Sequence, residues 1–243
     1  MRPSGRDLNQ MREVTIETGI LTHADGSCLI CVGDTRVICS ASLGERVPMF
    51  RRNTGLGWIT CEYAMLPGST HSRNRRERTV GHPSGRSQEI QRLVGRSLRS
   101  CVEFASMGER QIIIDCDVIN ADGSTRCAAV TGGWVALRIA MDRLMEGRKI
   151  ASDPLVNQVA AVSCGAYAGQ TLLDLDYAED SEAETDANFV MNDDGNWIEV
   201  QCTAEGMPFT SARLTEFLSL AEFGITQLFA LQRSAVGRLL PVA

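Results

Sequence analysis

The chain has 243 residues, of which 44% are hydrophobic and 22% are charged, and its formal net charge is −6. This composition is ordinary for a soluble globular protein, and the length allows either one large domain or two tightly joined halves. No apolar stretch follows the N-terminal residues and no long window is uninterruptedly apolar, so we expect neither a signal peptide nor a membrane-spanning helix.

The charges are divided unevenly along the chain. Eleven arginines and only three acidic residues lie between Arg46 and Arg99, whereas the segment 150–212 holds twelve Asp or Glu residues and no Lys or Arg. A basic half can neutralise a polyanion, and an acidic patch can hold a divalent cation. The division therefore favours chemistry on phosphodiesters.

The nine cysteines are an odd number at irregular spacing in apolar contexts. This usage is typical of reduced thiols, so we expect a cytoplasmic protein. Cys28 and Cys31 fit a C-x-x-C pattern, but no second pair follows them, and their surroundings indicate a strand.

The first part of the chain alternates predicted strands with two predicted helices. The segment from Leu66 to Ser87 has no apolar period and is rich in Gly, Pro, Ser and Arg, which indicates a long exposed loop. Apolar periodicity predicts helices over Ser87–Phe104 and Ser124–Met145, the second mostly apolar and therefore buried between layers. Strands are predicted over Val14–Leu21, Ser27–Val32, Thr35–Ser42, Gly57–Met65 and Gln111–Ile119.

The second part repeats this theme. An acidic loop interrupts its strands, and a long helix is predicted from Ser211 to Val236. The strands are predicted at Val159–Ala166, Leu172–Leu175, Asn188–Met191 and Trp197–Cys202. Both parts thus place strands before helices, which favours an α+β fold of two similar halves, residues 1–150 and 151–243.

The segment Asn120–Arg126 lies between a predicted strand and a predicted helix. Such a turn offers free backbone N–H groups and the positive end of the helix dipole to an anion. Ser124 or Thr125 can cap the helix, and Arg126 adds a planar fork for phosphate. The alternative is an ordinary capped helix with a surface arginine.

Two other basic segments are candidates for binding RNA. Gly85-Arg86-Ser87 opens the earlier helix, and the arginines that follow it fall near one helical face, namely Arg92, Arg96 and Arg99. The loop 72–78 holds Arg73 and Arg76 and has little apolar content, as in a flexible arm that contacts an RNA backbone. A solvated face or a subunit contact is the alternative for both segments.

A dense acidic segment, Glu179–Asp186, follows the strand that contains Asp174 and Asp176. Carboxylates this close repel one another unless a cation or arginines lie among them. Mg²⁺ takes one or two carboxylates and completes its shell with water and phosphate oxygens. A solvated surface loop is the alternative.

These segments, in this order, resemble those of the ribonuclease PH family, the phosphorolytic 3′→5′ exoribonucleases of bacteria. The resemblance covers nearly the whole chain and is carried by long ordered motifs. They are Met1–Arg6, Gly57–Pro67, Gly85–Arg96, Ile114–Gly123, Asp176–Asp186 and Ile198–Gly206.

The resemblance implies the ribosomal protein S5 domain 2-like fold of this family, with two pseudo-repeated βα halves in one compact unit, and a homo-hexamer built as a trimer of dimers. It implies that Arg86 holds inorganic phosphate together with Ser124, Thr125 and Arg126. Asp180 and Asp186 match the acidic pair that binds Mg²⁺, or alternatively Mn²⁺. The basic loop, including Arg73 and Arg76, would guide the 3′ end of precursor tRNA or other RNA.

The implied reaction is attack of phosphate on the terminal phosphodiester with release of a nucleoside diphosphate. Two alternatives are metal-dependent hydrolysis by water and a catalytically silent RNA-binding ring subunit. Three residues depart from the family pattern: Ser124 replaces a glycine, Cys127 a common threonine and Gly68 a common arginine. A positive φ at Ser124 would cost on the order of 1 kcal/mol, whereas a negative φ would allow its hydroxyl another hydrogen bond.

Overall fold

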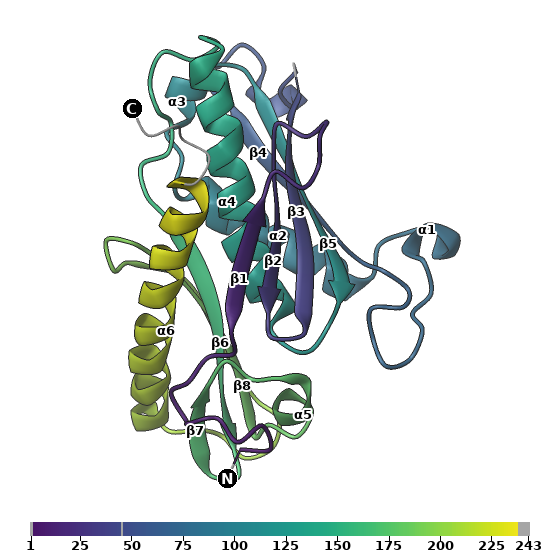
Figure 1. Ribbon diagram of the computed structural model, residues 1–243, viewed down its shortest axis with the longest axis vertical. Helices are drawn as coiled ribbons and strands as arrows, with labels where there is room; N and C mark the ends of the chain where they lie inside the picture. Colours follow the sequence, from purple (N-terminus) through teal and green to yellow (C-terminus); the bar gives the residue numbers. More distant parts are fainter. Residues whose placement is uncertain (1, 45, 238–243) are drawn as a thin grey trace.

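Two β-sheets, one from each part of the chain, form the framework of the fold (Figure 1). The computed structural model describes residues 2–44 and 46–237. Met1, which opens the first quoted motif, therefore lies outside the described residues. The sheets contain five and four strands, and helices pack on them. The architecture agrees with the predicted α+β class.

The first sheet has the strand order β1-β2-β3-β5-β4. Only β4 and β5 run parallel, whereas the other neighbours are antiparallel. Helices α2 (Gly85–Arg99) and α4 (Thr125–Glu146) pack against this sheet. The strands are β1 (Val14–Thr18), β2 (Gly26–Val32), β3 (Thr35–Gly44), β4 (Trp58–Met65) and β5 (Gln111–Asn120).

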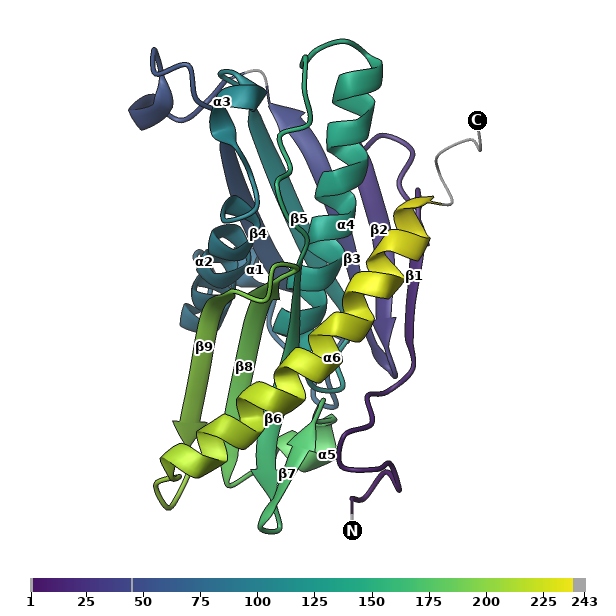
Figure 2. The same ribbon diagram turned by 90° about the vertical axis from the view of Figure 1, so that its left-hand side faces the viewer.

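The second sheet has the order β7-β6-β8-β9 and is antiparallel throughout. Helix α6 (Ser211–Gly237) crosses β6 and β7, as Figure 2 shows. The short helix α5 (Tyr177–Asp180) lies between β7 and β8 in the chain. The strands are β6 (Val159–Tyr167), β7 (Gln170–Leu173), β8 (Thr185–Asn192) and β9 (Trp197–Ala204).

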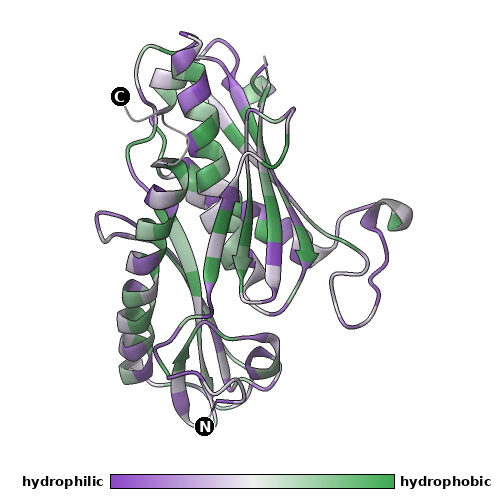
Figure 3. Ribbon diagram, in the orientation of Figure 1, coloured by the Kyte–Doolittle hydropathy of each residue, from purple (hydrophilic) through white to green (hydrophobic). Residues whose placement is uncertain are grey.

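Helix α4 joins the two halves, because it packs against β2 and β3 of the first sheet and also against β6 of the second. Most of its residues are buried, including Trp134 and Leu137. In Figure 3, hydrophobic residues (green) lie along α4 and along the strands beside it. A helix covered on several sides needs apolar residues around most of its circumference, which explains the mostly apolar sequence of this segment.

Helix α6 is the described helix that bears on the expectation of no membrane span. Within residues 2–44 and 46–237, α6 is the one helix whose length and apolar composition would allow it to cross a membrane. One face of α6 packs on the second sheet through Phe217, Ile225 and Leu228. A core helix passes the same test of length and composition, so α6 is weak evidence for a membrane span and does not contradict the sequence-based expectation.

The other differences from the predicted elements concern short segments. The predicted helix Ser87–Phe104 begins at Gly85 and ends at Arg99, and Phe104 opens the separate helix α3 (Phe104–Met107). The predicted loop after Leu66 contains α1 (Glu77–Val80), and η1 (Met49–Arg51) precedes β4. The Glu103 side chain caps α3 by accepting from the N–H of Ala105. All three of these helices are only three or four residues long, which is too short for an apolar period that a sequence scan can detect.

The N-terminal segment packs on the C-terminal half rather than on the first sheet (Figure 2). Arg2 is almost fully buried and forms an ion pair with the buried Glu179, at 2.7 Å between Nε and Oε1. The backbone N–H of Leu173 donates to the carbonyl of Leu8 at 2.9 Å. A division of the chain at residue 150 remains a prediction, and the first residues of the chain lie against the second part.

Candidate active site

A cavity of about 390 Å³ lies where α2, α4 and α5 begin or end. Both halves of the chain contribute to it. Its lining includes Arg86 from the first turn of α2, Gly123, Ser124 and Thr125 at the start of α4, and Tyr177 and Asp180 of α5. The predicted arginine, turn and acidic segment therefore meet at one place.

The turn before α4 has a left-handed backbone. Gly123 has a φ of 76° and Ser124 a φ of 56°. A Cβ on Gly123 would lie 2.6 Å from the carbonyl oxygen of Leu175, so the turn packs directly on the chain that leads to α5. Of the two possibilities that the sequence left open for Ser124, the structure has the positive φ, with its cost on the order of 1 kcal/mol.

The predicted capping of α4 by Ser124 is wrong. Ser124 occupies the N-cap position, but within the described chain its side chain makes no hydrogen bond to the first turn of the helix. The hydroxyl of Thr125 instead lies 2.9 Å from the hydroxyl of Tyr63 on β4, and both side chains are buried. The first-turn N–H groups of α4 thus keep no partner from an N-cap side chain, which leaves them suited to an anion.

The two arginines assigned to phosphate differ in how they are held. Arg86 is exposed in the first turn of α2 and lines the cavity. The side chain of Arg126 is 14% exposed, and its Nη1 donates to Glu89 at 3.0 Å and to Gln201 at 3.1 Å. Glu89 and Gln201 therefore hold the guanidinium of Arg126 in place. The exposed side chain of Arg86 can adjust its conformation to a ligand.

The pKa values of Asp180 and Asp186 are both raised. Burial raises the pKa of Asp180, and the charge of Asp186 raises it further, against the opposing charges of Arg86 and Arg126. Burial likewise raises the pKa of Asp186, although Arg126 and Arg86 again oppose the shift. Two carboxylates that are costly to ionise together are suited to a divalent cation, which relieves their repulsion.

The chemistry of the donors fits Mg²⁺. In the described part of the chain no group of three or more His, Cys, Asp or Glu side chains is placed to hold a metal. The carboxylates of Asp180 and Asp186 would supply two protein oxygen ligands, and water or phosphate oxygens would supply the rest. Mg²⁺ accepts this arrangement, whereas structural Zn²⁺ sites need four protein ligands.

The arginines predicted to bind RNA lie in different settings. Arg73 and Arg76 are exposed on the long loop that projects from the body of the protein (Figure 1). The second group lies on α2. Arg92 is exposed, and Arg96 pairs with Glu199 at 2.5 Å.

Arg99 differs from the rest of the group. Its guanidinium donates to the carbonyl of Ile59 at 3.1 Å and lies 4.8 Å from the ring centroid of Trp58. It is thirteen residues beyond Arg86, which places it roughly 20 Å along the helix. Arg92, Arg96 and Arg99 therefore do not present one continuous free stripe.

Three residues of the site escaped the sequence analysis. Tyr63 appears in a strand pattern as a core residue, yet it positions Thr125. Arg12 and Asp174 form an ion pair beside the turn, at 2.6 Å between Nη2 and Oδ1. Asp174 was visible only as one acid among many, and Arg12 stands outside every motif. Residues joined from distant parts of the chain leave no spacing signal.

Comparisons with known proteins match the chain to one family over most of its length. Residues 10–141 match the model of domain 1 of the 3′ exoribonuclease family, and residues 157–223 match that of domain 2. The chain is 59% identical over 237 residues to "Ribonuclease PH" of Cereibacter sphaeroides, covering 98% of this chain and 100% of that protein. It is 54% identical over 237 residues to "Ribonuclease PH" of Caulobacter vibrioides, again with 98% and 100% covered.

Two solved structures show the same fold. One is that of Rrp46 from rice (Oryza sativa), with a TM-score of 0.78 and 19% identity over 97% of this chain and 100% of that one. The other is the Archaeoglobus fulgidus exosome with RNA bound to the active site, with a TM-score of 0.79 and 20% identity over 94% and 91%. At these identities the likeness establishes the fold alone, and it confirms the predicted fold class.

Proposed function

The chain belongs to the ribonuclease PH family of phosphate-dependent 3′ exoribonucleases, and we propose that the cavity between α2, α4 and α5 is where it shortens RNA. Inorganic phosphate attacks the terminal phosphorus of the RNA. A new P–O bond forms to the phosphate, the bond to the ribose 3′ oxygen breaks, and a nucleoside diphosphate leaves. The observation that carries this proposal is the meeting of Arg86, the Gly123–Thr125 turn and Asp180 around one cavity.

The N-terminal half would hold the attacking phosphate. Arg86 and Arg126 neutralise its charge, while the backbone of Ser124 and Thr125 orients it at the start of α4. The Tyr63 hydroxyl keeps Thr125 in place, and Glu89 keeps Arg126 in place. Positioning of this kind supplies much of the rate of phosphoryl transfer, because the two reacting anions repel each other until they are held together.

The C-terminal half would hold the metal. We assign Asp180 and Asp186 as the ligands of Mg²⁺ or Mn²⁺. When bound, the ion would supply charge stabilisation at the scissile phosphate and the leaving oxygen. The raised pKa values of the two carboxyls support this assignment. Burial makes their ionised forms unfavourable, and a bound cation would stabilise those forms. Their carboxylates must be ionised to bind the ion.

The RNA would approach along the projecting loop. A second cavity of about 340 Å³ shares Met65, Asn74 and Arg86 with the first, and Arg75 also lines it. Arg73 and Arg76 are exposed nearby in the sequence, on the same loop. The rings of His71 and Tyr177 lie 4.9 Å apart at the first cavity and offer a surface on which a terminal base can stack.

We assign further RNA contacts to Arg92 and Arg96, whose side chains are exposed, with Arg99 as a weaker candidate because it is bound to β4. Precursor tRNA is the proposed substrate class. A cytoplasmic homo-hexamer, arranged as a trimer of dimers, is the proposed assembly. Two of the structural neighbours, the Archaeoglobus fulgidus exosome and an archaeal exosome core, support an assembly of more than one chain.

The product of the reaction tests the proposal. The purified protein would be incubated with a 3′-labelled RNA and Mg²⁺, with and without inorganic phosphate. We expect a labelled nucleoside diphosphate that appears only with phosphate. A nucleoside monophosphate released without phosphate would instead establish hydrolysis, and RNA binding without release would establish a silent subunit.

A pair of variants would tie this reaction to the cavity. Arg86→Gln should raise the KM for phosphate by about tenfold or more, because a charge-assisted hydrogen bond to phosphate is lost. Arg143→Gln is the matched control, since Arg143 lies in the last turn of α4 and contacts the carbonyl of Ala24. An equal effect of both variants would contradict the assignment of the cavity.

A further inference from the structure

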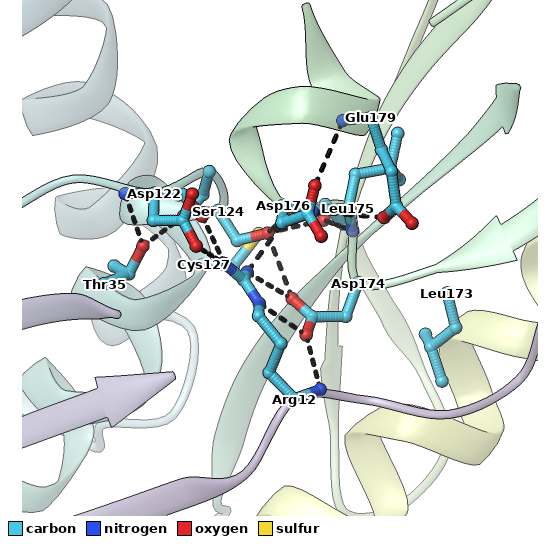
Figure 4. A network of polar contacts seen from close by, with 12 residues as sticks. Arg12, Thr35, Asp122, Ser124, Cys127, Leu173, Asp174, Leu175, Asp176 and Glu179 are labelled. Atoms are coloured by element: carbon cyan, nitrogen blue, oxygen red, sulfur yellow. Dashed lines mark hydrogen bonds and ion pairs between the residues drawn. The ribbon is translucent and has the colours of Figure 1, made fainter. Parts of the chain in front are cut away.

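The hydroxyl of Ser124 is directed toward the C-terminal half, where Figure 4 shows it beside Asp174 and Leu175. Its Oγ lies 2.6 Å from the Oγ of Ser163 on β6, 3.2 Å from Oδ1 of Asp174 and 3.2 Å from the carbonyl oxygen of Leu175. All three partners belong to the half that carries the acidic pair. The side chain of Ser124 thus crosses from one half of the protein to the other.

The hydrogen bonds at Ser124 form a chain in which every donor has an acceptor. The N–H of Leu175 donates to Ser163 Oγ at 3.1 Å. The Ser163 hydroxyl can then donate to Ser124, and the Ser124 hydroxyl to the carboxylate of Asp174. Ser163 and Asp174 are each only 3% exposed, so these bonds lie away from water, where an unpaired group is costly.

Arg12 holds the carboxylate at the end of this chain. Its Nε donates to Asp174 Oδ2 at 2.9 Å and its Nη2 donates to Oδ1 at 2.6 Å. The same guanidinium also donates to the carbonyl of Asp122, two residues before Ser124. Burial acts to raise the pKa of Asp174, but the hydrogen bonds and charge of Arg12 outweigh it and lower the pKa. Asp174 is therefore a fixed negative charge against which Ser124 is held.

The position of Asp174 also determines that of α5. Asp174 itself has a φ of 52°, and Asp176, two residues later, is the N-cap of α5 in a capping box with Glu179. That helix ends at Asp180, which lines the cavity. Because this connection is short and capped, we expect a shift of Asp174 to move the carboxylate of Asp180 as well.

We propose that Ser124 is a positioning residue, whose hydroxyl bonds to Ser163 and Asp174 set the phosphate-binding turn in register with the acidic pair. This inference rests on the proposed phosphorolysis, in which the attacking phosphate belongs to one half and the metal-held phosphate to the other. Loss of the hydroxyl removes one of the contacts that hold the turn against the connection to α5, beside the packing of Gly123 on Leu175. The attacking phosphate is then bound less well and at the wrong distance, whereas the RNA site on the loop is unchanged.

Two variants break the same contact from opposite sides. Ser124→Ala removes the hydroxyl from the turn, and Ser163→Ala removes its partner on β6. Each should lower kcat/KM for phosphate about fivefold to tenfold at saturating RNA, which corresponds to the loss of one buried hydrogen bond. The KM for RNA should stay within about twofold, because no RNA contact is altered. The double variant should lose less than the sum of the two single variants, since both remove the shared Ser124–Ser163 hydrogen bond.

Thr131→Val is the matched control. Thr131 lies on α4 and accepts from the N–H of Ala161 on β6 at 3.2 Å, so its hydroxyl also joins the two halves. The control should lose thermal stability to a similar degree as Ser124→Ala without a change in kcat/KM for phosphate. A readout without turnover is the rise in Tm on adding inorganic phosphate alone, which reports binding to the folded state.

The outcomes separate this inference from the proposed function. A phosphate-induced rise in Tm that is reduced in Ser124→Ala and Ser163→Ala but retained in Thr131→Val supports the positioning role. If the wild type releases diphosphates and both alanine variants match it in kcat/KM for phosphate, the positioning role is overturned and the phosphorolysis stands. If Thr131→Val loses as much kcat/KM as the alanine variants, their effect is general destabilisation, and the role is again overturned.

Discussion

Replacing Asp174 by asparagine tests how much the ion pair with Arg12 contributes to the junction of the two halves. The side chain of Asp174 is 4% exposed and that of Arg12 is 7% exposed. Asparagine has the same shape, but its amide group places donors where the Arg12 guanidinium also has donors. The variant would leave a buried guanidinium with only the partly exposed Asp122 as an acidic partner, at 3.4 Å.

The expected loss is about 3–5 kcal/mol in the free energy of unfolding, because one partner of a buried pair is removed and the other remains buried. Asp153→Asn is the matched control. Asp153 also pairs with an arginine, Arg138, at 2.6 Å, but its side chain is 44% exposed. Exposed pairs contribute about 1 kcal/mol or less, so the control should be nearly as stable as the wild type.

Urea denaturation at one protein concentration, followed by circular dichroism, measures both variants. The lowered pKa of Asp174 also fixes the sign of a pH effect. Stability from this pair is fully present above the pKa of the unfolded state and is lost as the pH falls through the lowered pKa of the folded state. The Asp174→Asn variant should therefore lose less stability on acidification than the wild type. Equal midpoints for Asp174→Asn and Asp153→Asn at neutral pH would refute the reasoning.

Three further predictions concern the cavity. Asp180→Asn should abolish phosphorolysis while retaining RNA binding in a gel-shift assay. The pKa of Asp180 is raised, so the ionised carboxylate destabilises the metal-free fold at neutral pH. The variant should therefore have a Tm at or above that of the wild type. Near-normal turnover with Mg²⁺ would contradict its assignment. Tyr63→Phe should lower the unfolding free energy by about 1 kcal/mol and raise the KM for phosphate, since the Thr125 hydroxyl loses its partner; an unchanged KM would remove Tyr63 from the site. Ser124→Gly should be about 1 kcal/mol more stable in urea than Ser124→Ala, because both lack the hydroxyl and only alanine retains the strain of a positive φ; equal stability would show that this φ is not strained.

The longer elements could be predicted from the sequence because they combine an apolar period with a clear turn. The strand predicted at Gln111–Ile119 is β5, Gln111–Asn120, and the helix predicted at Ser124–Met145 is α4, Thr125–Glu146. The acidic segment behaved differently. It contains α5, whose capping box is a four-residue feature, and the start of β8, where Asp186 occupies a strand. Neither has an apolar pattern long enough to show in a scan.

The site could be predicted only as a set of segments. Thr125 was found from the local turn, whereas the resemblance to the family supplied the roles of Arg86 and Asp180, and the structure brings all three to one cavity. The pair Tyr63 and Thr125 joins residues 62 apart, and Arg12 and Asp174 join residues 162 apart. Such contacts depend on how the two halves pack, which a spacing argument cannot see.

The backbone of Ser124 and the role of Arg99 show the same limit. The sequence left the sign of φ at Ser124 open, because packing of the turn against Leu175 determines it. Helical spacing placed Arg99 with Arg92 and Arg96, but it does not show that Trp58 and the carbonyl of Ile59 lie beside it. Periodicity identifies the face of a helix and does not identify what that face contacts.

The central claim is that inorganic phosphate, held beside Arg86 and the start of α4, is the nucleophile. The most direct measurement uses unlabelled RNA, Mg²⁺ and isotopically labelled inorganic phosphate, followed by identification of the labelled product. Phosphorolysis predicts that the label appears in the β-phosphate of nucleoside diphosphates, at one label for each nucleotide released. Release of nucleotides that carry no label would contradict the account.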